Sequence, residues 1–166
     1  MVGVAQPDYL QPAAERAAIR ADYLRSERPA SAARGIHHTA LICSDIRRTV
    51  EFYSGVLEFP LTEMVDNPDD RGSTQVFFDV GNGNLLAFVD RPDLDPAALA
   101  DVLGGLHHIA ISVEPVRWSQ LKANLDAAGV DYQMESGTSV CFRDPDGARL
   151  ELIADPLGDV DGTRVL

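Results

Sequence analysis

The sequence predicts an α+β fold made of two copies of one β-α-β-β-β unit. The segment GIHHTALI at 35–42 recurs as GLHHIAIS at 105–112, and both segments read as buried strands. A second pair of segments, 78–87 and 142–151, reads in both copies as a strand, a tight turn containing glycine and another strand. An amphipathic helix follows each His-His strand, so the two halves have the same order of elements.

The first unit is placed at 35–90. After its opening strand, Ser44 or Asp45 suits the N-cap of a helix that extends to about Gly55. The apolar residues of this helix recur at spacings of three and four: Ile46, Val50, Tyr53 and Leu57. A further strand at about 61–65 precedes the hairpin, which completes the unit.

The second unit is placed at 105–155 and repeats this order. Its helix covers about 116–128, with Gly129 as the stop signal. A strand at about 130–134 then precedes the second hairpin. The apolar side of the helix carries Trp118, Leu121 and Leu125.

Three segments lie outside the repeat. Residues 91–104 form a predicted linker with a short helix near 96–103, and 156–166 form a C-terminal tail. Residues 1–34 form an N-terminal extension whose alanines and charges favour a helix at 12–25. We expect this extension to act as a peripheral arm or as a dimer contact.

Composition and charge exclude several classes of function. Hydrophobic residues make up 45% of the 166 residues and charged residues 24%, a balance typical of globular proteins. The net charge of −12 disfavours nucleic acid and membrane surfaces as partners. No apolar run reaches the ~18 residues of a membrane span, and 1–34 lack the apolar core of a secretory signal. Two cysteines form no disulfide framework, so we expect a cytoplasmic location.

The candidate chemistry lies in the histidines. All four fall in two adjacent pairs at equivalent places of the repeat, and strand alternation turns one histidine of each pair to each face. Glu151 lies in a strand between leucines, where a carboxylate is costly to bury unless it is paired or bound to a metal. Two imidazoles and one carboxylate are the facial triad of non-haem Fe(II), which Mn, Zn, Ni or Co can also occupy. Hydrogen-bonded histidines and a solvent-facing glutamate are the alternative interpretation.

Several of these segments together resemble the vicinal oxygen chelate superfamily, which includes glyoxalase I, extradiol dioxygenases, fosfomycin-resistance transferases and bleomycin-resistance proteins. The resemblance lies at 35–41 and 51–59 in the first unit, and at 106–110 and 142–152 in the second. It covers about 35–154 and implies that the paired modules form a cup-shaped mixed sheet around a metal.

The resemblance also implies a ligand set. The second histidine of each pair and the glutamate after Asp-Pro-Asp-Gly are the ligands in the family pattern, which assigns His38, His108 and Glu151. The fourth metal-facing position falls on Ala87, which cannot bind a metal. Family members with one pair of modules are usually homodimers, so we expect a homodimer that binds a small-molecule substrate.

The three-ligand set resembles extradiol dioxygenases and fosfomycin transferases more than glyoxalase I. No lysine ahead of Glu151 matches the transferase pattern, so the leading hypothesis is an Fe(II) dioxygenase acting on a small aromatic or oxygen-bearing substrate. Cys141 replaces the tyrosine of ring-cleaving enzymes, which leaves Tyr132 as a candidate proton donor and Arg149 as a candidate substrate-binding residue. A glyoxalase-type isomerase or lyase and a non-enzymatic binding protein, like the bleomycin-resistance proteins, are the alternatives.

Overall fold

The computed structural model describes residues 10–24, 27–28, 30–66, 73–94, 103, 105–160 and 163–165. The chain divides into two units, Met1–Gly35 and Ile36–Leu166. The first unit contains helix α1 (Leu10–Tyr23), where the sequence predicts a helix at 12–25. In the described part of the chain, no helix is long and apolar enough to cross a membrane.

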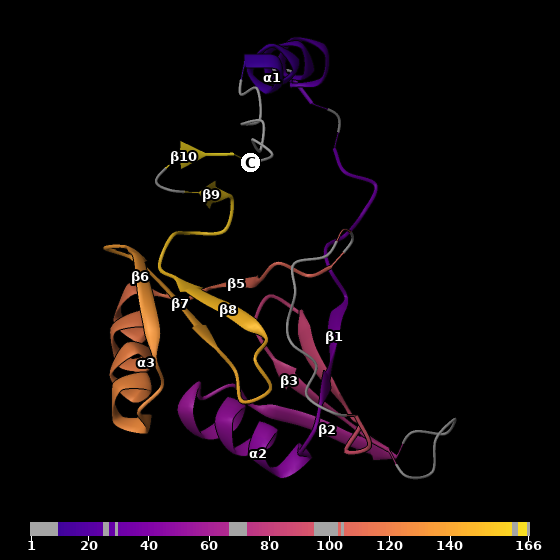
Figure 1. Ribbon diagram of the computed structural model, residues 1–166, viewed down its shortest axis with the longest axis vertical. Helices are drawn as coiled ribbons and strands as arrows, with labels where there is room; N and C mark the ends of the chain where they lie inside the picture. The colour runs from indigo at the N-terminus through magenta and orange to yellow at the C-terminus, as the bar shows by residue number, and fades with distance from the viewer. Residues whose placement is uncertain are drawn as a thin grey trace, which may run out of the picture. The chain divides into compact units, whose positions relative to one another are not determined.

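The second unit contains two four-stranded mixed sheets (Figure 1). The first sheet has the order β1-β4-β3-β2, in which β1 and β4 are parallel and the other neighbours antiparallel. Its strands are β1 (His38–Cys43), β2 (Leu61–Asp66), β3 (Thr74–Asp79) and β4 (Leu85–Asp90). Between β1 and β2, the predicted single helix is α2 (Ile46–Val50) followed directly by the π-helix η1 (Glu51–Val56). Asp45 is the N-cap, and its carboxylate accepts a hydrogen bond from the Arg48 amide at 3.0 Å.

The second sheet has the equivalent order, β5-β8-β7-β6. Its strands are β5 (Ile109–Ser112), β6 (Tyr132–Ser136), β7 (Ser139–Arg143) and β8 (Arg149–Ile153). Helix α3 (Pro115–Ala128) ends at Gly129, whose φ of 67° is the left-handed conformation expected of a glycine stop. A short pair, β9 (Asp159–Val160) and β10 (Thr163–Arg164), follows. The duplicated β-α-β-β-β order and the α+β class are therefore confirmed, whereas the predicted linker helix at 96–103 lies almost wholly outside the described residues.

The core lies between the two modules. Tyr53 is fully buried, and its ring packs against Phe78 and Phe88 of the first sheet. Its hydroxyl donates a hydrogen bond of 3.0 Å to the buried Asp144 of the second module. Burial raises the pKa of Asp144. Because the core covers one face of each sheet, the site must be sought on the opposite faces.

Candidate metal centre

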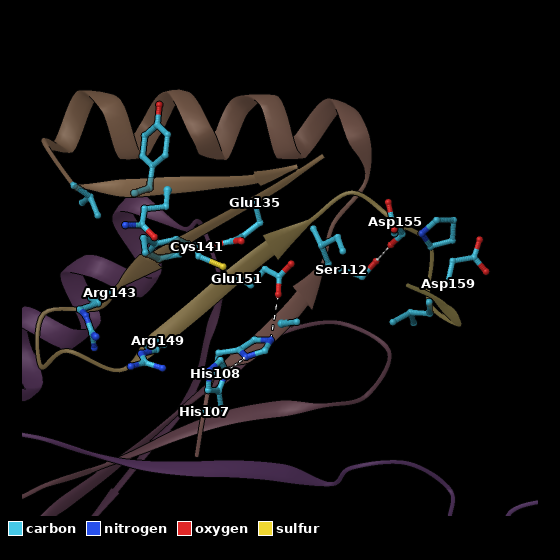
Figure 2. A pocket seen from close by; sticks show the side chains of 18 of the residues that line it. His107, His108, Ser112, Glu135, Cys141, Arg143, Arg149, Glu151, Asp155 and Asp159 are labelled. Carbon is cyan, nitrogen blue, oxygen red and sulfur yellow. Dashed lines mark hydrogen bonds and ion pairs between the residues drawn. The ribbon is translucent and has the colours of Figure 1, made fainter. Parts of the chain in front are cut away.

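The face of the second sheet that is turned away from the core, here called its open face, carries Glu151, the predicted carboxylate ligand. Leu150 and Leu152 are fully buried, whereas Glu151 between them points to the opposite face, as strand alternation requires. Glu151 pairs with Ala110 on β5 and with Cys141 on β7. These side chains line a groove with a cavity volume of about 1260 Å³, which Figure 2 shows from close by.

His108 and Glu151 both line this groove and lie against each other (Figure 2). The His108 Nε2 atom lies 3.2 Å from the Glu151 Oε2 atom. The other carboxylate oxygen, Oε1, accepts a hydrogen bond from the Ser139 hydroxyl, which fixes the carboxylate. Two donors about 2.1 Å from one cation stand roughly 3.0–3.4 Å apart at tetrahedral or octahedral angles, so this pair fits two ligands of a divalent metal.

Each first histidine of the two pairs contacts the second. The Nδ1 atoms of His107 and His108 are 2.7 Å apart, and those of His37 and His38 are 2.9 Å apart. One ring of each pair must donate and the other must accept, so a proton on the Nδ1 atom of one ring requires a lone pair on the Nδ1 atom of the other. A lone pair on His108 Nε2 requires its proton on Nδ1, where His107 can accept it. The sequence predicts that strand alternation turns one histidine of each pair away from the metal, but His107 lines the same groove as His108, because both precede β5 and strand alternation does not apply to them.

His38 lies on β1, in the first sheet. Among the described residues, no group of three or more histidine, cysteine, aspartate or glutamate side chains is placed to hold a metal ion. The structure of one chain therefore brings together His108 and Glu151, but not His38. Sequence reasoning expected the two modules of one chain to bring these ligands together.

The equivalent position in the first sheet is Ala87. Ala87 pairs with Ala40 on β1, just as Glu151 pairs with Ala110 on β5. The register therefore supports the sequence assignment of Ala87 to the fourth metal-facing position. The first sheet therefore has the imidazole of His38 on β1 but no carboxylate at the position equivalent to Glu151.

Of the two accessory residues predicted from the sequence, Arg149 faces the groove beside Glu151, whereas the hydroxyl of Tyr132 is bound by helix α3. Tyr132 pairs with the buried Phe142, one position out of phase with Cys141 and Glu151. Its hydroxyl lies 2.6 Å from the Lys122 Nζ atom and donates to the Asp126 carboxylate at 2.7 Å, so it is engaged by helix α3. This placement speaks against Tyr132 as a proton donor at Glu151.

Arg149 lies two residues before Glu151 on the same face of β8 and lines the groove. Cys141, which occupies the predicted tyrosine position, lies opposite Glu151. Burial, followed by the nearby Glu151 and Glu135 carboxylates, raises the pKa of the Cys141 thiol. Cys141 is therefore expected to stay protonated at neutral pH. Ser139 is the site residue that sequence reasoning missed, although it faces the same side as Cys141 by strand alternation.

Comparison with known proteins identifies the family of this chain. Residues 35–152 match the family described as the Glyoxalase/Bleomycin resistance protein/Dioxygenase superfamily. The chain belongs to this superfamily. The metallothiol transferase FosB of Shouchella clausii is 32% identical over 126 residues, which cover 71% of this chain and 78% of that protein. Sequence reasoning disfavoured the transferase branch because a lysine was absent, yet a transferase is among the relatives.

Two solved structures extend the comparison. The trypanothione-dependent glyoxalase I of Leishmania major is 26% identical, with a TM-score of 0.61 over 73% of this chain and 86% of that chain. The fosfomycin resistance protein FosX of Mesorhizobium loti is 21% identical, with a TM-score of 0.58 over 75% of this chain and 94% of that chain. At 21% identity, the likeness to FosX shows a shared fold and nothing more.

Proposed function

We propose that this protein is a divalent-metal enzyme that activates a small, oxygen-bearing substrate for attack by a thiol or by water. The observation that carries the proposal is the pair of His108 Nε2 and Glu151 Oε2, which lie 3.2 Å apart in the lining of a groove, with the carboxylate held by Ser139. A metal bound there would act as a Lewis acid on substrate oxygens. The side chains of this chain would hold the metal, orient the substrate and line the groove.

The third ligand in this proposal is His38 from a second copy of the chain. The open face of the first sheet carries His38 at its edge, and β2 is exposed along its whole length. The same face exposes the large apolar side chains of Ile42 and Val65, which mark a contact surface. A homodimer in which this face covers the groove of the partner would complete the His-His-Glu set and exclude water from the site.

Addition of a nucleophile is preferred to dioxygenation for two reasons. The relative at 32% identity is a metallothiol transferase. In addition, the tyrosine position of ring-cleaving enzymes holds Cys141, and Tyr132 is engaged by α3. Attack by a thiolate needs no side-chain base at Ala87, whereas isomerisation of the glyoxalase type needs a base for proton transfer. A cytoplasmic location, where thiols are kept reduced, suits both this chemistry and the free cysteines.

An Fe(II) dioxygenase is the second candidate, because two histidines and one carboxylate are the donor set of such enzymes. Under this hypothesis the same residues hold iron, and the substrate is an aromatic diol. Isomerase chemistry of the glyoxalase type is a variant of the first candidate, since it also uses the metal as a Lewis acid. A protein that takes up no metal would instead be a binding module.

The test begins with metal content, measured on protein purified without oxygen or chelator, followed by titration with Mn(II), Zn(II) and Fe(II). We expect about one bound metal per chain in the wild type and none in Glu151→Ala. Glu51→Ala, which removes an exposed carboxylate of a weak ion pair, is the matched control and should keep its metal. Metal retained by Glu151→Ala would disprove the assigned ligand set.

Activity assays then separate the two candidates. Metal-loaded protein is given a thiol together with fosfomycin or methylglyoxal, and thiol consumption is followed without oxygen. Turnover under these conditions supports the addition chemistry. Oxygen uptake with catechols by the Fe(II) form alone would overturn it in favour of dioxygenation.

A further inference from the structure

The groove of the second sheet contains a pair of arginines beside the candidate metal ligands. Arg143 at the end of β7 and Arg149 at the start of β8 are direct cross-strand partners. Side chains of directly opposed residues project to the same face of a sheet. Both arginines line the groove, and Arg149 is two residues from Glu151 on that face.

Charges of opposite sign occupy opposite ends of this groove. Figure 2 shows Arg143 and Arg149 at one end, with Asp155 and Asp159 at the other and Glu151 between them. The chain has 14 lysines and arginines against 26 aspartates and glutamates, so its overall field repels anions. A cationic pair inside a groove can reverse that repulsion locally, and Arg149 lies two residues along β8 from the candidate metal ligand Glu151.

The hairpin between β7 and β8 holds one of the two guanidinium groups in place. Arg143 Nη1 donates a hydrogen bond of 2.7 Å to the Gly147 carbonyl. The turn that carries Gly147 is itself tied down, since the Asp144 carboxylate accepts hydrogen bonds from the Asp146 and Ala148 amides at 3.0 and 2.8 Å. Such a guanidinium loses little conformational freedom when it binds an anion, which favours recognition.

We propose that Arg143 and Arg149 form an oxyanion subsite, which binds a carboxylate or phosphoryl group of the substrate while its other oxygens face His108 and Glu151. This inference rests on the proposed function, because it takes the groove as the substrate site. It narrows the substrate class to small molecules with an acidic group close to the reacting oxygens. Guanidinium groups bind both kinds of oxyanion through paired N–H donors.

The experiment titrates the full-length, metal-free protein with inorganic phosphate and, separately, with acetate by isothermal calorimetry. Working without metal prevents phosphate from binding a cation at the ligand set. We expect saturable binding to the wild type, weakened at least about tenfold by Arg149→Gln and by Arg143→Gln. The stronger of the two ligands indicates whether the subsite prefers phosphoryl or carboxylate groups.

The controls separate a specific subsite from general charge. Arg47→Gln removes an equal charge from an exposed helix position and should leave anion binding unchanged. Arg149→Lys keeps the charge but loses the paired donors, so its affinity should fall between those of the wild type and Arg149→Gln. Asp131→Asn, which removes a carboxylate that lines the same groove, should strengthen binding.

Mn(II) uptake separates a failure of the oxyanion subsite from a failure of the metal site. Arg149→Gln should still take up one Mn(II) per chain, whereas Glu151→Gln should lose Mn(II) but still bind the anion without metal. Absence of saturable anion binding to the wild type would overturn the subsite and leave the metal site standing. Equal weakening by Arg47→Gln would also overturn it, as would unchanged binding in both groove variants.

Discussion

The two sheets share their strand order, and each opens with a histidine pair, but their open faces carry different side chains. The second sheet presents Glu151 beside His108, with Ser139 holding the carboxylate. The first sheet presents His38, and its equivalent of Glu151 is the buried Ala87. In the proposed metal site, the second module would supply two ligands and the first only one. Repetition of the fold does not produce two equal half-sites, and a complete triad requires both kinds of face.

The strongest test of this comparison is complementation between two inactive variants. His38→Ala lacks the ligand of the first sheet, and Glu151→Ala lacks the carboxylate of the second. If the site forms between copies, each mixed dimer contains one intact site, made of His38 from one chain and His108 with Glu151 from the other. Unfolding and refolding the two variants together should therefore restore metal binding at about a quarter of all sites.

Metal content and thiol consumption of the mixture measure this recovery. Each variant refolded alone should recover none, and a mixture of two batches of the same variant is the control. A mixture that stays free of metal, although chain exchange is verified with a tagged copy, would contradict a shared site.

A smaller effect is expected from the first histidine of the second pair. The 2.7 Å contact between His107 Nδ1 and His108 Nδ1 can keep the proton on His108 Nδ1 when Nε2 binds a metal. His107→Ala should lower Mn(II) affinity by about 10–100-fold, because partners of metal-bound histidines typically contribute that much. His107→Asn, whose carbonyl can accept the same proton, should restore part of the loss.

Mn(II) affinity can be followed by the electron paramagnetic resonance signal of the free ion, which does not depend on turnover. The His37→Ala variant tests whether the equivalent contact of 2.9 Å acts in the same way in the first sheet. Wild-type affinity in both alanine variants would show that these contacts do not position the ligands.

Local patterns predicted most of this fold, because strand alternation, helix caps and glycine turns act over a few residues. Asp45 and Gly129 bound their helices as the sequence predicts, and the register reproduces the equivalence of Ala87 and Glu151. The position of His38 depends on how one module packs against the other, and no local pattern encodes that packing. The orientation of Tyr132 depends on the register of β6 against β7, in which Tyr132 pairs with Phe142 and so lies out of phase with Cys141.

The smallest expected effect concerns the end of the first sheet. Asp90 ends β4, and its Oδ1 atom is buried without a hydrogen-bond partner among the described residues. The equivalent place after β8 is Ala154, which carries no charge. Burial, followed by the neighbouring Asp45 and Asp146 carboxylates, raises the pKa of Asp90. Ionised Asp90 therefore opposes folding, and we expect Asp90→Asn to increase the free energy of unfolding at pH 7 by less than about 1 kcal/mol.

The sign of the pH dependence makes this prediction specific. A carboxyl whose pKa is raised in the folded state binds its proton more tightly there than in the unfolded chain. The destabilisation by Asp90 is therefore complete above the folded-state pKa and is relieved as pH falls towards the unfolded-state value. The gain from Asp90→Asn should accordingly shrink on acidification, whereas Asp93→Asn should show the opposite trend, because hydrogen bonds from Arg91 lower the pKa of the Asp93 carboxyl. Urea unfolding of the three proteins at several pH values measures both trends, and a pH-independent gain in Asp90→Asn would show that lost charge is not its cause.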